Sequence, residues 1–275
     1  MYNRGYVFSF KETTNDYFDF RGNMTEYLID INELDRIAAL FGLYPQNHRH
    51  FDVDDPVLSM DVVFKYTMPS SYAYINSQRF FPSPMHLKQL QVMPDTESVC
   101  SRPQASRLLV NIIENNHYKQ RIRCIMDATA HVGTDTITLA MHFDLCSIIS
   151  VEKDDQTAML LKRNIHKCGF KNVTVLNTDC VDLLRQNLYR PDILYIDAPW
   201  GGPMYKTKKT VSLLLNGIDI GEIVSSLCND IPCVILKTPI NFDMASFERY
   251  VQNKTSTLFP YVVHETLKFN FLMLM

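Results

Sequence analysis

Four acidic residues each follow a short apolar run, and their spacing predicts that they gather at one edge of a sheet. Asp127, Glu152, Asp179 and Asp197 lie one strand-and-helix unit apart along the chain. In an open α/β sheet, ligands bind beyond the carboxyl ends of the strands. A single acid in such a place is typical of a helix cap, whereas four in register favour a ligand. Carboxylates accept hydrogen bonds, so Glu152 would hold two ribose hydroxyls and Asp179 an adenine amine. Asp127 and Asp197 are expected to bind the same ligand.

The loop at residues 127–136, DATAHVGTDT, follows the first apolar run and leads into a helix. Small side chains let a backbone approach a ligand, and a helix start offers unpaired N–H groups. The candidate cofactor-binding residues of this loop, besides its acid, are Thr129, Ala130, Gly133 and Thr134. The loop lacks the Gly-x-Gly-x-x-Gly pattern that suits a dinucleotide pyrophosphate, because His131 stands where a glycine is expected. It therefore favours S-adenosylmethionine, a cofactor without phosphate, over a dinucleotide.

The elements that must position these residues begin at Pro103, where apolar runs start to alternate with amphipathic segments. The periodicity predicts helices at 104–115, 134–143, 155–169, 182–188, 218–227 and 247–253. It predicts strands at 123–127, 147–152, 172–177, 192–197, 232–237, 261–265 and 267–274, the last two forming a closing hairpin. Strands alternating with helices in this way are typical of an α/β fold, in which helices cover both faces of a mostly parallel sheet.

The first part of the chain, residues 1–95, has a different texture and is interpreted as a smaller N-terminal lobe. Its irregular pattern predicts one helix near 31–43 and a strand near 58–66. This lobe would either bind substrate or cap the sheet as a structural element. The catalytic domain would then comprise residues 96–275.

Composition narrows the class of protein. The chain has 275 residues, is 46% hydrophobic and carries a formal charge of -3. This net negative charge does not attract nucleic acid, so any nucleic-acid substrate would be bound by local contacts at an end or a single nucleotide. Seven scattered cysteines without a Cys-x-x-Cys pair suggest neither a disulfide framework nor a metal site. Because we find no signal peptide and no membrane-spanning stretch, we expect a soluble intracellular protein, cytoplasmic or nuclear, that makes no membrane contact.

The run at residues 197–205, DAPWGGPMY, resembles the Pro-Pro-Trp-Gly-Gly-Pro-x-Tyr motif of the trimethylguanosine synthase family, the RNA cap guanine-N2 methyltransferases. The loop DATAHVGTDTITLA is similar to the cofactor loop of that family, and SVCSRPQ at 98–104 is similar to its Ser-Val-Thr-Pro-Glu run. The resemblance covers residues 96–240 and extends to compact members from large DNA viruses. It implies a Rossmann-like class I methyltransferase with a seven-stranded sheet, S-adenosylmethionine as cofactor, and capped RNA or a cap nucleotide as partner.

The resemblance also implies roles for the residues near the lone tryptophan. Trp200 would stack on a 7-methylguanine base, which is cationic and therefore attracted to an indole face. Asp197 and the carbonyls of Ala198 and Pro199 would orient the exocyclic amine that receives the methyl group. We therefore expect Asp197, Pro199 and Trp200 to be catalytic. The residues expected to bind substrate are Trp200, Tyr205, Lys206 and Lys208, although the lysines equally suit a solvated basic loop.

Departures from the family pattern keep two alternatives open. Ala198 replaces the first proline, His131 and Thr134 replace glycines, and Asp197 stands at a position that varies among amino-methylating enzymes. The Asp-x-Pro-Trp core alone is shared with adenine-N6 methyltransferases of DNA or RNA, so this activity is one alternative. The lost glycines suggest another, a catalytically inactive methyltransferase fold that binds caps or serves as a scaffold subunit.

Overall fold

The computed structural model describes residues 75–76, 78–83, 85, 90–92, 99–116 and 122–275. The chain divides into two compact units, Met1–Tyr74 and Ile75–Met275. The helix predicted at 31–43 and the strand predicted at 58–66 lie outside the described residues, so the lobe at 1–95 stays a prediction. The described residues just before 96 belong to the second unit, where the amide of Asn164 donates to the carbonyl of Gln91 at 2.9 Å.

The described elements follow the predicted alternation closely. The strands are β1 (Ile75–Asn76), β2 (Gln91–Val92), β3 (Cys124–Asp127), β4 (Ser147–Glu152), β5 (Val173–Asn177), β6 (Ile193–Ile196), β7 (Leu214–Leu215), β8 (Ile218–Asp219), β9 (Cys233–Pro239), β10 (Ser256–Val263) and β11 (Thr266–Leu274). The helices are α3 (Pro103–Asn116), α4 (Thr134–His142), α5 (Asp155–Cys168), α6 (Cys180–Gln186), α7 (Ile220–Leu227) and α8 (Met244–Glu248). Two 3-10 segments, η2 (Gln78–Phe80) and η5 (Pro203–Thr207), complete the set.

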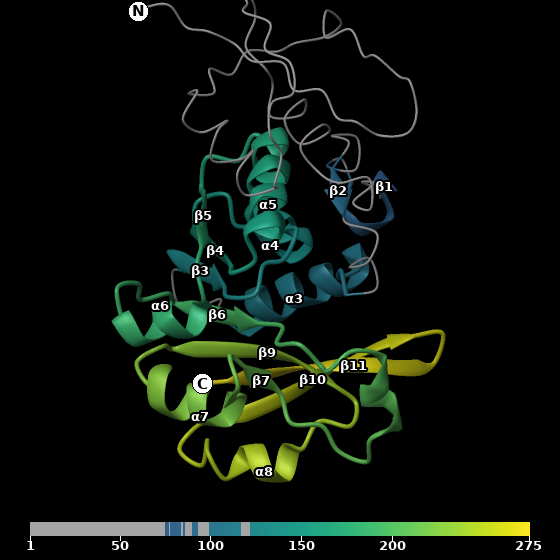
Figure 1. The fold of residues 1–275 in the computed structure, drawn as a ribbon, viewed down its shortest axis with the longest axis vertical. Helices are drawn as coiled ribbons and strands as arrows, with labels where there is room; N and C mark the ends of the chain where they lie inside the picture. Colours follow the sequence, from purple (N-terminus) through teal and green to yellow (C-terminus); the bar gives the residue numbers. More distant parts are fainter. Residues whose placement is uncertain (1–74, 77, 84, 86–89, 93–98, 117–121) are drawn as a thin grey trace, which may run out of the picture. The chain divides into compact units, whose positions relative to one another are not determined.

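Seven strands form one sheet in the order β10-β11-β9-β6-β3-β4-β5 (Figure 1). The pairings β5–β4, β4–β3, β3–β6 and β6–β9 are parallel, while β11 runs antiparallel to both β9 and β10. The predicted seven-stranded, mostly parallel sheet is confirmed. The parallel part matters for function, because it brings the carboxyl ends of β3, β4, β5 and β6 to the same edge.

Apolar clusters cover both faces of this sheet, as the periodicity predicts. On one face Leu109 and Ile113 of α3 and Leu139 of α4 pack with Ile125 and Ile148 of the sheet. On the other face, residues of α6, α7 and α8 pack with the opposite side of the same strands. The central strands β6 and β9 are buried along their whole length, which explains why they read as continuous apolar runs.

The fold differs from the sequence prediction near the C-terminus. The helix predicted at 247–253 is wrong in its placement: α8 begins at Met244, because the carboxylate of Asp243 caps it by accepting from the Ser246 N–H at 3.1 Å. The strand predicted at 261–265 instead begins at Ser256. The 3-10 segment η5 and the small β7–β8 hairpin had no periodic signal long enough to predict them.

Three observations concern membranes, disulfides and metals. No helix in the described part of the chain is both long enough and apolar enough to span a bilayer. All seven cysteines lie among the described residues, where they form no disulfide. Within those same residues, no three His, Cys, Asp or Glu side chains are grouped so as to hold a metal ion.

Candidate active site

A cleft of about 1430 Å³ lies along the carboxyl ends of the parallel strands. Its floor includes Thr129 after β3, Glu152 at the end of β4, Asp179 after β5 and Asp197 after β6. Residues 99–102, 104 and 105 and the β10–β11 hairpin also line it. The four strand ends that the sequence marks with acids therefore contribute to one cleft, although not every acid faces it.

Asp127 is the acid that does not line the cleft. Its side chain is buried, and its Oδ2 accepts a hydrogen bond from the Thr136 hydroxyl at 2.6 Å. Burial, together with the nearby Asp135 carboxylate, raises the pKa of Asp127 to about 7, although the hydrogen bond from Thr136 opposes that shift. The carboxylate holds the start of α4 against the end of β3, so in the described structure it supports the loop rather than touching the cleft.

The loop after β3 is folded tightly by its own backbone. The Ala130 N–H donates to the carbonyl of Val151, and the Gly133 N–H donates to the carbonyl of Ala130, both at 2.9 Å. His131 has φ of 51° and Gly133 φ of 93°, a region that favours glycine. The glycine missing from the family pattern at position 131 is thus replaced by a histidine that still adopts the left-handed backbone. The loop shape does not require glycine there.

Side chains of this loop divide between the cleft and the interior. Thr129 and His131 line the cleft, whereas Ala130, Gly133 and Thr134 do not, within the described residues. The Thr129 hydroxyl accepts from the Asp197 N–H at 2.8 Å and so ties the loop to the end of β6. The Nε2 atom of His131 is buried and has no hydrogen-bond partner among the described residues. Burial lowers the pKa of His131 to about 4, so its ring is neutral at pH 7.

Glu152 and Asp179 line the neighbouring part of the cleft. Oε2 of Glu152 accepts from the His131 N–H at 3.0 Å, and its Oε1 accepts from the Asp154 N–H at 2.8 Å. A carboxylate offers about four acceptor positions, so Glu152 retains capacity for a ligand. Asp179 caps α6 with one oxygen, which accepts from the Val181 N–H at 2.8 Å. Capping and lining the cleft are therefore compatible roles.

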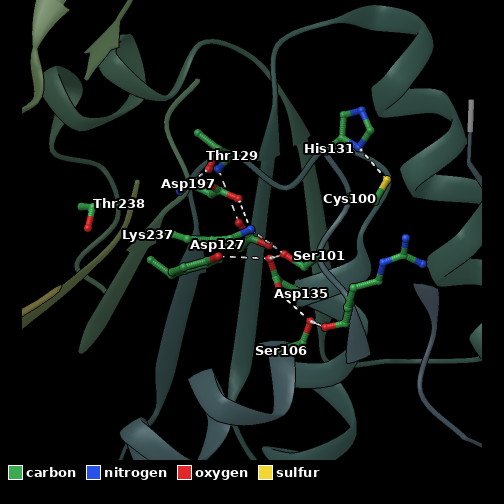
Figure 2. Close-up of polar contacts among 12 residues, drawn as sticks. Cys100, Ser101, Ser106, Asp127, Thr129, His131, Asp135, Asp197, Lys237 and Thr238 are labelled. Carbon is green, nitrogen blue, oxygen red and sulfur yellow. Dashed lines mark hydrogen bonds and ion pairs between the residues drawn. The ribbon is translucent and has the colours of Figure 1, made fainter. Parts of the chain in front are cut away.

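Asp197 belongs to a chain of polar contacts that the sequence did not predict (Figure 2). Its Oδ2 lies 2.6 Å from the ammonium of Lys237, which also donates to the Ser101 hydroxyl at 2.9 Å. Ser101 in turn donates to Oδ2 of Asp135 at 2.6 Å, and Tyr195 donates to the same oxygen at 3.1 Å. Five residues from four separate segments thus converge behind the floor of the cleft.

The charges of the ion pair follow from these contacts. Burial raises the pKa of Asp197, while Lys237 opposes that shift. Burial alone would lower the pKa of Lys237, but the carboxylates of Asp197 and Asp135 outweigh it, and the net result is a raised pKa. Lys237 is therefore charged at neutral pH. The sequence does contain a signal that could have revealed this pair. Lys237 interrupts the apolar run CVILKTP of β9, and a buried ammonium requires an anionic partner.

Trp200 stands beside the ion pair, half-buried, in an aromatic wall of the cleft. Its ring lies 5.2 Å from that of Tyr205 in a T-shaped arrangement and 6.1 Å from that of Phe269. Its indole Nε1 is buried without a hydrogen-bond partner among the described residues. Pro199 and Lys206 are exposed, whereas Tyr205 is half-buried. Within this segment Pro199, Trp200, Tyr205, Lys206 and Lys208 all line the cleft.

Comparison with known proteins finds relatives in sequence and in fold. The chain is 25% identical over 204 residues to uncharacterized protein L320 of Acanthamoeba polyphaga mimivirus, covering 65% of this chain and 79% of that protein. It is 28% identical over 148 residues to the trimethylguanosine synthase of Schizosaccharomyces pombe, covering 51% of this chain and only 59% of that protein. The structure of a putative methyltransferase from Porphyromonas gingivalis W83 shares the fold, with a TM-score of 0.52 and 15% identity over 90% of this chain and 59% of that one.

The fold is that of the class I methyltransferases, whose cofactor is S-adenosylmethionine. Residues 122–265, about half of the chain, match the family described as RNA cap guanine-N2 methyltransferase. The matched region includes the loop after β3, the strand ends that carry Glu152 and Asp179, and the Asp197–Trp200 segment. The chain therefore belongs to the RNA cap guanine-N2 methyltransferase family.

Proposed function

We propose that this protein transfers a methyl group from S-adenosylmethionine to the exocyclic N2 amine of a 7-methylguanosine RNA cap. The observation that carries the proposal is the adjacency of Asp197 and Trp200 in one cleft, with the Asp197 carboxylate held by Lys237 at 2.6 Å. An aromatic face beside a fixed carboxylate suits a flat base that carries an amine. Family membership supports the same acceptor.

The residues present fit S-adenosylmethionine. Glu152 has acceptor positions left for ribose hydroxyls, and one oxygen of Asp179 receives no hydrogen bond from described residues. The buried Nε2 of His131, which lines the same region, lacks a partner that a polar ligand would supply. These three residues would hold the cofactor. Asp127, Ala130, Gly133 and Thr134 would then act by shaping the loop rather than by direct side-chain contact.

A cationic base suits the other end of the cleft. Asp135 and Asp197 lie near Lys237, and Asp127 lies near both carboxylates, so these described residues carry more negative than positive charge even with Asp127 half-protonated near pH 7. A positive charge placed against Trp200 would gain from both the indole face and this excess of carboxylates. Lys206 and Lys208, exposed at the rim, would contact cap phosphates as point charges.

S-adenosylmethionine supplies an electrophilic methyl group on a sulfonium. The amine of guanine is a poor nucleophile, so the chain has to hold it in line and exclude water. Asp197 would accept a hydrogen bond from this amine, and the main-chain carbonyls of Ala198 and Pro199 would fix its direction. Asp197 can also receive the proton, which becomes acidic once the methyl group has been transferred.

Trp200→Ala tests the proposal. We expect cap binding to weaken roughly 100-fold, because stacking contributes about 1–3 kcal/mol and cation–π attraction up to about 2 kcal/mol. Binding of S-adenosylmethionine, measured by calorimetry, should persist. Trp200→Phe is the matched control, since it keeps a ring and should lose less affinity.

The activity itself is measured with labelled S-adenosylmethionine and a 7-methylguanosine cap, followed by nucleoside analysis. Label in N2-methylated 7-methylguanosine is the expected result. Equal activity of the Trp200→Ala variant and the wild type would contradict the proposal. Label in an adenine-containing oligonucleotide, but not in the cap, would instead select an adenine-N6 methyltransferase. Cap binding without cofactor binding would select an inactive scaffold.

A further inference from the structure

Lys237 is an unusual residue for its position. It lies in β9, a central strand of the sheet whose residues are all buried, and only 5% of its own surface is exposed. Its ammonium nevertheless borders the cleft that Trp200 lines. Burying a charge is costly unless it is paired, and pairing Asp197 is one function of this lysine. The contacts of Lys237 indicate a second function.

The ion pair leaves one donor and one acceptor unused among the described residues. A lysine ammonium has three N–H donors, and two are taken by Asp197 Oδ2 and the Ser101 hydroxyl. The third meets no acceptor there, and the ammonium lies 5.1 Å from the centre of the Phe269 ring and 5.9 Å from that of Trp200. The other oxygen of Asp197, Oδ1, accepts no hydrogen bond from the described residues. A donor and an acceptor thus stand side by side next to Trp200.

The charge of this pair is fixed by its surroundings. Facing it are Asp135 from α4, Tyr195 from β6, and Cys100 from the segment before α3. The carboxylate of Asp135 favours the charged form of Lys237, and burial raises the pKa of Cys100 to about 12, so the thiol stays neutral. Burial likewise raises the pKa of Tyr195, whose phenol stays neutral as well. Lys237 is therefore a donor only.

A guanine presents this pair with a complementary edge. Its N2 and N1 positions are hydrogen-bond donors and the neighbouring O6 is an acceptor. Adenine presents the reverse, an amine donor at position 6 and an acceptor at N1. We propose that Lys237 is a specificity-determining residue, which donates its third N–H to O6 of guanine while Asp197 Oδ1 accepts from the amine. This inference rests on the proposed function and extends it to the choice of base.

The energetic reason is that a mismatched base leaves buried groups unpaired. Sites built to hydrogen-bond a ligand reject analogues that lack the matching group far more strongly than apolar pockets do. With adenine in the same place, the ammonium of Lys237 would face an amine, and neither could accept. The selection would therefore come from a repulsive contact as well as from an attractive one.

The test compares 7-methylguanosine 5′-diphosphate with its 6-thio analogue, which keeps N1–H and the N2 amine but replaces O6 with a weaker acceptor. Binding is followed by quenching of Trp200, the single tryptophan. We expect the wild type to bind the thio analogue roughly 10-fold more weakly, as befits a hydrogen bond from a charged donor. In Lys237→Met the two ligands should bind within about twofold of each other. Ser101→Ala keeps the ion pair and should keep the wild-type ratio.

Lys237→Met leaves the Asp197 carboxylate unpaired and can fail to fold, so a second variant is included. Lys237→Met with Asp197→Asn removes both charges together and should also lose the preference for oxygen over sulfur. The same ratio in either variant as in the wild type would overturn the inference. So would weaker S-adenosylmethionine binding with an unchanged ratio, because the lysine would then face the cofactor carboxylate. Failure of the wild type to bind either nucleotide would remove the proposed function itself.

Discussion

Replacing Asp127 with asparagine should remove a large pH dependence from the stability of the methyltransferase unit. Asp127 is 1% exposed, and burial raises its pKa from 3.8 to about 7. At about 1.4 kcal/mol per pH unit, that difference corresponds to about 4 kcal/mol. Because the pKa is higher in the folded state, the folded protein takes up a proton that the unfolded chain releases. The stabilisation is complete below pH 3.8 and is lost as the pH rises through about 7.

The assay is urea unfolding of the full chain at pH 5, 6, 7 and 8, followed by the fluorescence of Trp200, which lies in the methyltransferase unit. Asparagine resembles the protonated acid and does not titrate. The free energy of unfolding of the wild type should therefore fall by about 2 kcal/mol relative to Asp127→Asn between pH 5 and pH 7, and level off near pH 8. Asp182→Asn, which removes an exposed carboxylate, is the control. Parallel curves for the wild type and Asp127→Asn would refute the reasoning.

Two further variants test the loop and the cofactor site. Gly133→Ala should cost about 1–2 kcal/mol, because φ there is 93°; urea unfolding measures it. Gly169→Ala, where φ is 79° and nothing lies within 4 Å of an added Cβ, isolates the backbone cost, and any larger loss at Gly133 reports contact with Leu161. Glu152→Gln should weaken S-adenosylmethionine binding roughly 10-fold in calorimetry, because a charged acceptor is lost; an unchanged affinity would exclude Glu152 from that site.

Much of the fold followed from periodicity in the sequence. The strand predicted at 147–152 coincides with β4, and α4 differs from its predicted range only at its last residue. Most residues of these two segments are buried, so their apolar residues recur with the period of the helix or strand that they form. The α8 helix was displaced because it has only five residues, and its position is set by the Asp243 cap rather than by periodicity. Short elements depend on single contacts that hydrophobic patterns do not contain.

The acids at the strand ends were recognised as a group, but their individual orientations were not predictable. Glu152 and Asp197 line the cleft, whereas Asp127 turns inward to Thr136. In sequence each is an acid after an apolar run. What separates them is where the side chain points at the end of a strand, and that is decided by partners distant in the chain. The Asp197 carboxylate is oriented by its ion pair with Lys237, forty residues later in the chain.

The carboxylates at the two ends of the cleft have different partners: backbone N–H groups contact Glu152, and a lysine ammonium contacts Asp197. We expect the two ends to bind different ligand groups for this reason. Glu152 receives its hydrogen bonds from backbone N–H groups and forms no ion pair with a lysine or arginine among the described residues. Burial raises its pKa, and these hydrogen bonds oppose that shift. Asp197 is bound to an ammonium, which holds one oxygen and directs the other. Because one oxygen is already held, the direction of the free oxygen determines which hydrogen-bond donor of a base can reach it. We therefore expect discrimination between bases to depend on the β6–β9 end of the cleft, where the only buried lysine among the described residues lies.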